Sequence, residues 1–283
     1  MEYLKNFEFD WKQYLSNNPD LVNAGITTQN KAWKHFVKFG KKEGRICNKI
    51  NNTELFIAGR FGNMLFINLV CDYFARLNNI KMKYYNYEKF KELGINLYIG
   101  ENTYNETIFL SDKNIDDIFL DNLKSSQKNI SVEGDHWFQT RNIAKYIRGF
   151  IIDNVKKCKK REGVFIHVRL GDITNNCNED YEYYDLALSN NIFTDGYISS
   201  DSIGHDICKK LIEKYSLKIY EGNEVETINF GSSFENIVLS KGTFSWSIGV
   251  LANGSNIYYP EKINGKIWHG DIFVFDDWKK IIY

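Results

Sequence analysis

Residues 163–172, GVFIHVRLGD, constrain this chain more than any other stretch. Apolar residues run into a cluster of His167, Arg169 and Asp172, and Gly171 allows the backbone to turn sharply there. This pattern predicts a buried strand that delivers polar side chains at its carboxyl end, where open α/β sheets bind ligands. The planar fork of donors on an arginine suits it to binding phosphate. An ion pair between Arg169 and Asp172 inside the fold explains the same residues equally well.

Composition and charge exclude several classes of protein. The chain has 283 residues, enough for one large or two medium domains, and its 36 basic and 36 acidic residues give no field that would attract nucleic acid or an anionic membrane. The five cysteines are scattered without metal-ligand spacing, which favours free thiols in a reducing compartment. No apolar run follows Met1 and no stretch approaches membrane-spanning length, so we expect a cytoplasmic protein.

Residues 1–47 are predicted to form a separate helical module. Apolar residues with the i, i+3, i+4 spacing of short amphipathic helices begin at Trp11 and again at Trp33, with Pro19 stopping or restarting the chain between them. The exposed side of the second helix is expected to be basic, with Lys31, Lys34, Lys38, Lys41, Lys42 and Arg45. A solvated face is the simpler interpretation of these charges, and a binding surface for a protein or glycan partner is the alternative.

Strands and helices are predicted to alternate through the rest of the chain. The predicted strands are 55–58, 81–85, 97–99, 107–110, 130–133, 163–168, 196–201, 217–220, 234–239 and 256–259. The predicted helices are 64–77, one through 143–151, one that opens at 183–184, 207–215 and a last short one that includes Trp278 and Ile281; the segment 242–246, between the last two strands, completes the alternation. A glycine-bearing turn, 59–63, joins the first strand to its helix. We therefore predict an α/β fold with two doubly wound, Rossmann-like halves, 48–154 and 155–283, that face each other across a cleft.

Motifs for several common chemistries are absent from the sequence. It has no phosphate-binding loop, no G-x-G-x-x-G, no H-E-x-x-H, no G-x-S-x-G and no D-x-D of the kind that holds a metal in sugar transferases, so we expect no metal site. Polar residues that remain at predicted strand ends are Asn63, His136, Arg169, Asp172, Ser200, Asp201 and Ser245. Without a metal, an anionic leaving group would need stabilisation from arginine, hydroxyl and backbone N–H groups such as these.

Five motifs in residues 54–283 resemble those of one known family in order and spacing. They are AGRFGNMLF at 58–66, GDHWFQ at 134–139, HVRLGD at 167–172, SDS at 200–202 and GTFSWS at 242–247. The corresponding family patterns are G-G-L-G-N-Q-M-F, G-Y-F-Q, H-V-R-R-G-D, S-D-D and S-S-F-S-W-W. This part of the chain therefore resembles the α-1,2-fucosyltransferases of glycosyltransferase family 11. It departs from them at Leu170, which replaces an arginine, at Ser202, which replaces an aspartate, and at Ser247, which replaces a tryptophan.

The resemblance implies a GT-B fold, with the acceptor on the 48–154 half and the nucleotide-sugar donor on the 155–283 half. It implies metal-independent, inverting transfer of L-fucose from GDP-β-L-fucose to a glycan hydroxyl, with no cofactor. Arg169 would bind the pyrophosphate, Asp172 would hold Arg169 or contact the donor, and His136 is one candidate for the general base, beside Asp135 and Asp172. The implied donor-binding residues are Gly62, Asn63, His167, Arg169, Ser200, Asp201, Thr243, Phe244 and Ser245.

Two alternatives remain open from the sequence. Because Leu170 and Ser202 alter the donor contacts, the same fold could use another nucleotide deoxysugar, such as an activated rhamnose. The same departures, together with the appended module, fit a glycan-binding or assembly protein that has lost catalysis. The stretch from Phe9 to Arg45 resembles a small helical module found beside glycosyltransferase-like domains in giant viruses and some bacteria, which implies no chemistry of its own.

Overall fold

The computed structural model describes residues 9, 11–40, 43, 45, 60–120, 127–132, 136–156, 159–171, 181–191, 193–252, 254–261 and 271–283. Its helices are α1 (Trp11–Asn17), α2 (Pro19–Asn23), α3 (Gln29–His35), the π-helical turn η1 (Phe36–Gly40), α4 (Phe61–Asn78), α5 (Tyr87–Glu92), α6 (Ile115–Leu120), α7 (Arg141–Asn154), α8 (Tyr181–Ser189), α9 (Asp206–Tyr215), α10 (Glu224–Ser232) and α11 (Thr243–Leu251). Its strands are β1 (Glu106–Leu110), β2 (Lys128–Val132), β3 (Arg161–Val168), β4 (Gly196–Ser200), β5 (Lys218–Ile219), β6 (Phe234–Val238), β7 (Asn256–Glu261) and β8 (Lys279–Ile282).

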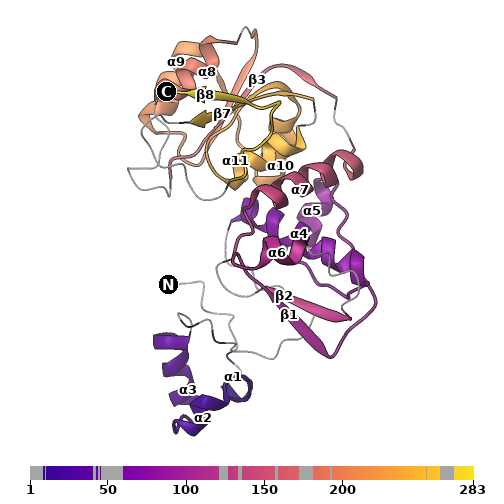
Figure 1. Cartoon of the computed structure of the whole chain (residues 1–283). Helices are drawn as coiled ribbons and strands as arrows, with labels where there is room; N and C mark the ends of the chain where they lie inside the picture. The colour runs from indigo at the N-terminus through magenta and orange to yellow at the C-terminus, as the bar shows by residue number, and fades with distance from the viewer. Residues whose placement is uncertain are drawn as a thin grey trace.

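A six-stranded parallel sheet organises the C-terminal part of the chain (Figure 1). Its strand order is β5-β4-β3-β6-β7-β8, so the chain runs outward from β3 in one direction and outward from β6 in the other. All of these pairings are parallel. The order is that of the doubly wound Rossmann sheet, and the predicted α/β class is confirmed.

Helices cover both faces of this sheet, and the alternation of side chains along β3 shows why. Val164, Ile166 and Val168 lie in a cluster with buried residues of α8 and α9. Phe165, from the opposite face, lies in the other large cluster, which contains residues of α10 and α11. Both faces of β3 are therefore buried, as expected for a central strand in a parallel sheet.

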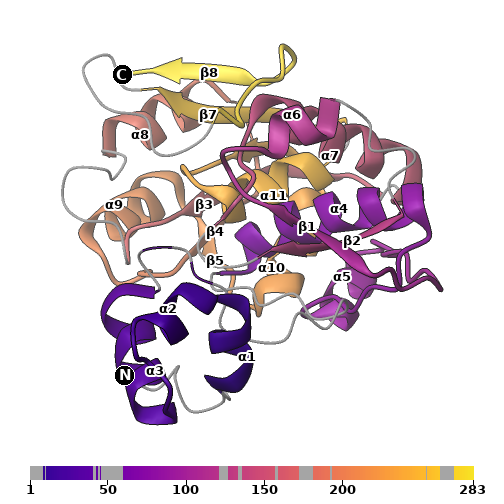
Figure 2. The same cartoon turned by 60° about the horizontal axis from the view of Figure 1, so that its bottom comes forward.

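The N-terminal part of this fold is built around α4 (Figure 2). This helix has 18 residues and is buried along most of its length. A two-stranded parallel sheet, β1-β2, lies beside it, with α5, α6 and α7. The large core cluster is continuous from α4 into α11, and the rings of Phe66 and Trp246 lie 4.7 Å apart. The predicted first strand, 55–58, lies outside the described residues.

Several predicted elements differ from those observed. Residues 81–84 and 97–99, predicted to be strands, are irregular, and a parallel bridge between Ile80 and Asn102 lies just outside them. The last element is the strand β8 rather than a helix, and it pairs with β7. The helices α5, α6 and α10 were not predicted.

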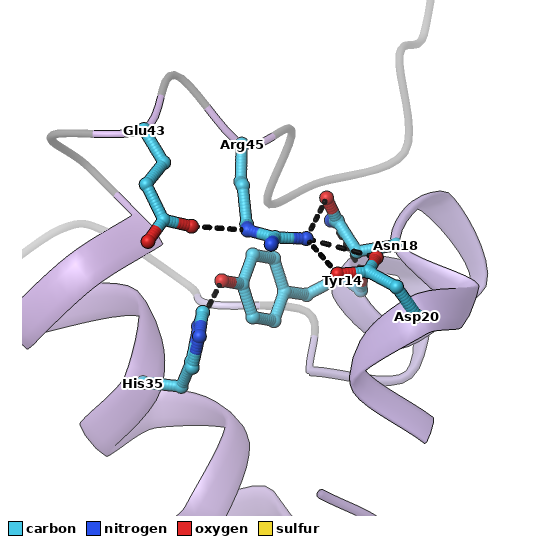
Figure 3. A network of polar contacts seen from close by, with 6 residues as sticks. All are labelled: Tyr14, Asn18, Asp20, His35, Glu43 and Arg45. Carbon is cyan, nitrogen blue, oxygen red and sulfur yellow. Dashed lines mark hydrogen bonds and ion pairs between the residues drawn. The ribbon is translucent and has the colours of Figure 1, made fainter. Parts of the chain in front are cut away.

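The helical module has a small core of its own, formed by Tyr14, Leu15, Leu21, Ala32 and Phe36. The Tyr14 hydroxyl is hydrogen-bonded to His35 Nδ1 at 2.8 Å, which ties α1 to α3 (Figure 3). Arg45 donates to Asp20, at 2.7 and 2.9 Å, and to Glu43, at 2.6 Å. Arg45, predicted to lie on an exposed basic side, is paired with these two carboxylates, and 24% of its side chain is exposed.

The basic side predicted for the second helix is exposed at Lys31, Lys34 and Lys38, and Lys41 and Lys42 lie outside the described residues. Of the cysteines, Cys71 and Cys208 are free and buried. In the part of the chain that the structure describes, no helix has both the length and the apolar character needed to cross a membrane.

Candidate functional site

The carboxyl ends of β3 and β6 lie side by side at the point where the sheet reverses its winding direction. The chain leaves β3 toward α8, on one face, and leaves β6 toward α11, on the other. Open α/β sheets bind ligands outside the carboxyl ends of their strands at such a switch point. The residues that follow β3 and β6 are therefore the first candidates for a binding site.

Arg169 comes directly after β3, and its guanidinium lies against the N-terminus of α11. The N-cap residue there is Gly242, whose φ of +101° is in the region that favours glycine. A Cβ at Gly242 would lie 2.3 Å from Arg169 Nη1, so the guanidinium occupies the space where a side chain at this position would begin. The arginine cation and the partial positive charge of a helix N-terminus thus meet at one place.

The side chain of Leu170 lies on the face of the sheet opposite to that of Arg169. It packs in the cluster that contains Val168, Tyr183 and Tyr184, on the α8 and α9 side of the sheet. Neighbouring residues on an extended chain face opposite sides, so a side chain at position 170 cannot share the position of Arg169. Leu170 therefore belongs to the core on the α8 and α9 side of the sheet.

Asp201, which follows β4, holds the turn that carries Arg169. Its Oδ1 accepts hydrogen bonds from the backbone N–H groups of Leu170, at 2.8 Å, and Gly171, at 3.2 Å. Its Oδ2 lies 3.8 Å from Nη1 of Arg60, the N-cap residue of α4. This carboxylate therefore links the end of β3 to the start of α4.

His167 is buried and uncharged at neutral pH. Its Nδ1 shares a 2.5 Å hydrogen bond with the Ser245 hydroxyl, which also accepts from the Ser240 backbone N–H at 3.1 Å. The pKa of His167 is lowered from 6.5 to about 4, mainly by burial; Asp201 opposes this shift, and the nearby Arg169 and Arg60 add to it. The histidine therefore fixes the start of α11 and adds no charge.

The buried His167 should make the protein less stable in acid. Between pH 6.5 and about 4, His167 is protonated in the unfolded chain and neutral in the folded protein. The free energy of unfolding therefore falls by roughly 3 kcal/mol as the pH drops through that window. Urea unfolding at a series of pH values measures it. His167→Asn keeps a nitrogen for Ser245 and cannot titrate, so its curve should be flatter; parallel curves for the two proteins would contradict the assignment.

The N-termini of α4 and α11 meet at Asn63. Its Oδ1 accepts the Thr243 hydroxyl at 2.6 Å and the Gln139 side-chain amide at 3.2 Å. Gly62 makes the contact possible, because a Cβ there would lie 2.4 Å from Phe244 N. Gly62 and Asn63 were predicted to lie in a turn, and they belong to the first helical turn of α4 instead. Two helix N-termini therefore converge beside Arg169.

The structure places most predicted site residues around this junction. Gly62, Asn63, His167, Arg169, Asp201, Thr243, Phe244 and Ser245 are joined by the contacts above, and the Phe244 ring lies 5.1 Å from that of His167. Ser200 acts on this group through Asp201: its hydroxyl accepts a hydrogen bond from the Ser202 backbone N–H and so stabilises the turn that carries Asp201. Asp172 and Asp135 lie outside the described residues.

His136 is not part of this group of contacts in the described structure. It lies beside Asp112, with Nδ1 3.6 Å from the carboxylate and 3.4 Å from the Asp112 backbone N–H. Asp112 also accepts from the backbone N–H groups of Trp137 and Phe138, so it holds the segment before α7 in place.

Three residues at the junction were not predicted. Arg60 and Gln139 lie inside two of the quoted motifs, and Lys241 follows β6 directly before Gly242. Of the charged groups described at this edge, Arg60 and Arg169 are cations and Asp201 is a carboxylate, while Lys241 is buried, with 4% of its surface exposed. The arrangement is suited to binding an anion with more than one negative charge. Within the described residues, no three His, Cys, Asp or Glu side chains form a group that could hold a metal ion.

Comparison of the chain with protein-family models finds no match, and neither does comparison with curated proteins. Any assignment of function therefore depends on the residues themselves and on the motif resemblance.

Proposed function

We propose that this chain is an inverting, metal-independent glycosyltransferase that moves L-fucose from GDP-β-L-fucose to a glycan hydroxyl. In this proposal the fold is of the GT-B type, with the donor held by the C-terminal sheet and the acceptor by the part built around α4. The observation that carries the proposal is the position of Arg169, at the switch point of a Rossmann-ordered sheet and over the N-terminus of α11.

The proposed chemistry follows from where negative charge develops. The acceptor hydroxyl oxygen attacks the anomeric carbon from the face opposite the nucleotide, and the bond from that carbon to the pyrophosphate oxygen breaks. GDP leaves with the bonding electrons, so its pyrophosphate gains charge in the transition state. Arg169 and the first N–H groups of α11 are positioned to stabilise that charge, each charge-assisted hydrogen bond contributing roughly 1.5–3 kcal/mol. The hydroxyl proton passes to a base or to water.

The nucleotide is the first thing to test. We expect GDP to raise the melting temperature by several degrees at about 100 times its Kd, because a ligand that binds only the folded state then adds about 2.7 kcal/mol. UDP and dTDP at the same concentration serve as controls. We also expect transfer of fucose from GDP-fucose to a glycan acceptor at an unchanged rate in EDTA.

The outcomes separate the alternatives. Stabilisation by another nucleotide but not by GDP would indicate a different activated sugar, such as rhamnose. Glycan binding without any nucleotide effect would favour a binding or assembly protein. If no nucleotide stabilises the fold and no nucleotide sugar is turned over, the proposal is wrong.

A further inference from the structure

A nucleotide diphosphate group needs more positive charge than Arg169 alone supplies. In the described part of the turn after β3, residues 169–171, Arg169 is the single cation, and Leu170 packs among Val168, Tyr183 and Tyr184 on the opposite face of the sheet. Lys241, before α11, is buried with 4% of its surface exposed, so an exposed second cation must come from another element.

Arg60 is the residue that reaches this place from the N-terminal part of the fold. As the N-cap residue of α4 it lies at the helix end that meets α11, and 54% of its side chain is exposed. Its Nη1 is 3.8 Å from Asp201 Oδ2, and Asp201 in turn holds the turn that carries Arg169.

We infer that Arg60 is the second cation of the anion site, and that it binds the diphosphate of a nucleoside diphosphate together with Arg169. The inference rests on the proposed function. Asp201 keeps Arg60 in place before the ligand arrives: at 3.8 Å the two charges attract each other over a distance longer than a hydrogen bond. Each half of the fold then contributes one arginine to the ligand, and the ligand stabilises the contact between the halves.

The test compares Arg60→Gln with a matched arginine elsewhere. Arg141 is equally exposed, at 58%, and is also paired with one aspartate, Asp271. We expect Arg60→Gln to weaken GDP binding on the order of tenfold, to flatten the dependence of Kd on salt, and to leave guanosine binding unchanged. We expect Arg141→Gln to change none of these, and Arg60→Lys to restore most of the affinity for GDP.

The melting temperature without ligand is the folding control, and it should stay within a degree or two of wild type for an exposed position. GDP affinity within twofold of wild type in Arg60→Gln would overturn the inference and leave the proposed function standing. An equal loss of guanosine affinity would also overturn it, because a contact to the diphosphate cannot cause that loss. A wild-type protein that binds no nucleoside diphosphate would overturn both.

Discussion

Replacing Arg169 with alanine should abolish sugar transfer and leave the protein folded. Arg169 is the first residue after the central strand, and its guanidinium lies over Gly242 at the start of α11. If it makes two charge-assisted hydrogen bonds to the leaving pyrophosphate, their loss lowers the rate by at least about a hundredfold. The measurements are the rate of transfer and the affinity for GDP by calorimetry.

Two further variants make this result specific. Arg169→Lys keeps the charge and loses the planar fork, so we expect a rate between those of wild type and Arg169→Ala. Arg141→Ala removes an exposed arginine whose partner is Asp271, and should transfer sugar at the wild-type rate. An unchanged rate in Arg169→Ala would remove this residue from the site, and with it the observation that carries the proposed function.

The C-terminal sheet could be predicted because most of its strands are short, continuous runs of apolar residues. β3 is an apolar run that ends in charged residues, and β4, β6 and β7 are likewise short apolar segments between helical patterns. β8 could not be predicted in this way. Trp278 and Ile281 have helical spacing, but residues 279–282 pair with β7, a parallel contact between segments that are not adjacent in the chain. The spacing of residues within a short segment does not predict that it pairs with a distant strand.

The helix α10 has a capping box at its N-terminus, a sequence pattern from which the helix could have been predicted. Asn223 and Glu226 form a reciprocal capping box, in which each side chain accepts the other residue's backbone N–H. At 97–99, by contrast, a strand was predicted and the structure has none. The Tyr98 N–H donates to the buried carboxylate of Asp72 at 2.6 Å, so a side chain of α4 replaces a neighbouring strand.

In the candidate site too, local sequence patterns predict single strand ends and not the contacts between distant segments. The positions of His167 and Arg169 follow from the end of one strand, and both could be predicted. Asn63 and Thr243 are 180 residues apart, and their hydrogen bond exists only because α4 packs on α11. Arg60 could not be assigned for a related reason: it was predicted to lie in a turn, whereas it is the N-cap of a helix that starts three residues before the predicted start. Spacing along the chain therefore predicted the polar end of the central strand and named Asn63 as a strand-end residue, whereas Gly62 was assigned to the site only through the motif resemblance and Arg60 was not assigned to it at all.

The contact between these two helix ends depends on Gly62, and replacing Gly62 with alanine should disrupt it. The new Cβ would lie 2.4 Å from Phe244 N and 2.5 Å from Thr243 C, both backbone atoms of a helix whose residues are almost all buried. Since α11 cannot yield without moving the core around Trp246, we expect a loss of about 3 kcal/mol in the free energy of unfolding, measured with urea. GDP affinity should fall as well, because the Asn63–Thr243 contact opens.

Gly149 provides the matched control. It lies inside α7, and a Cβ there would have no atom within 4 Å. Alanine favours a helix over glycine by about 0.8–1 kcal/mol, so Gly149→Ala should stabilise the protein by an amount of that order. The same chemical change is thus expected to have opposite signs at two helical glycines. If Gly62→Ala is instead as stable as wild type, α4 and α11 do not meet as described, and the binding site they form with Arg169 loses one of its sides.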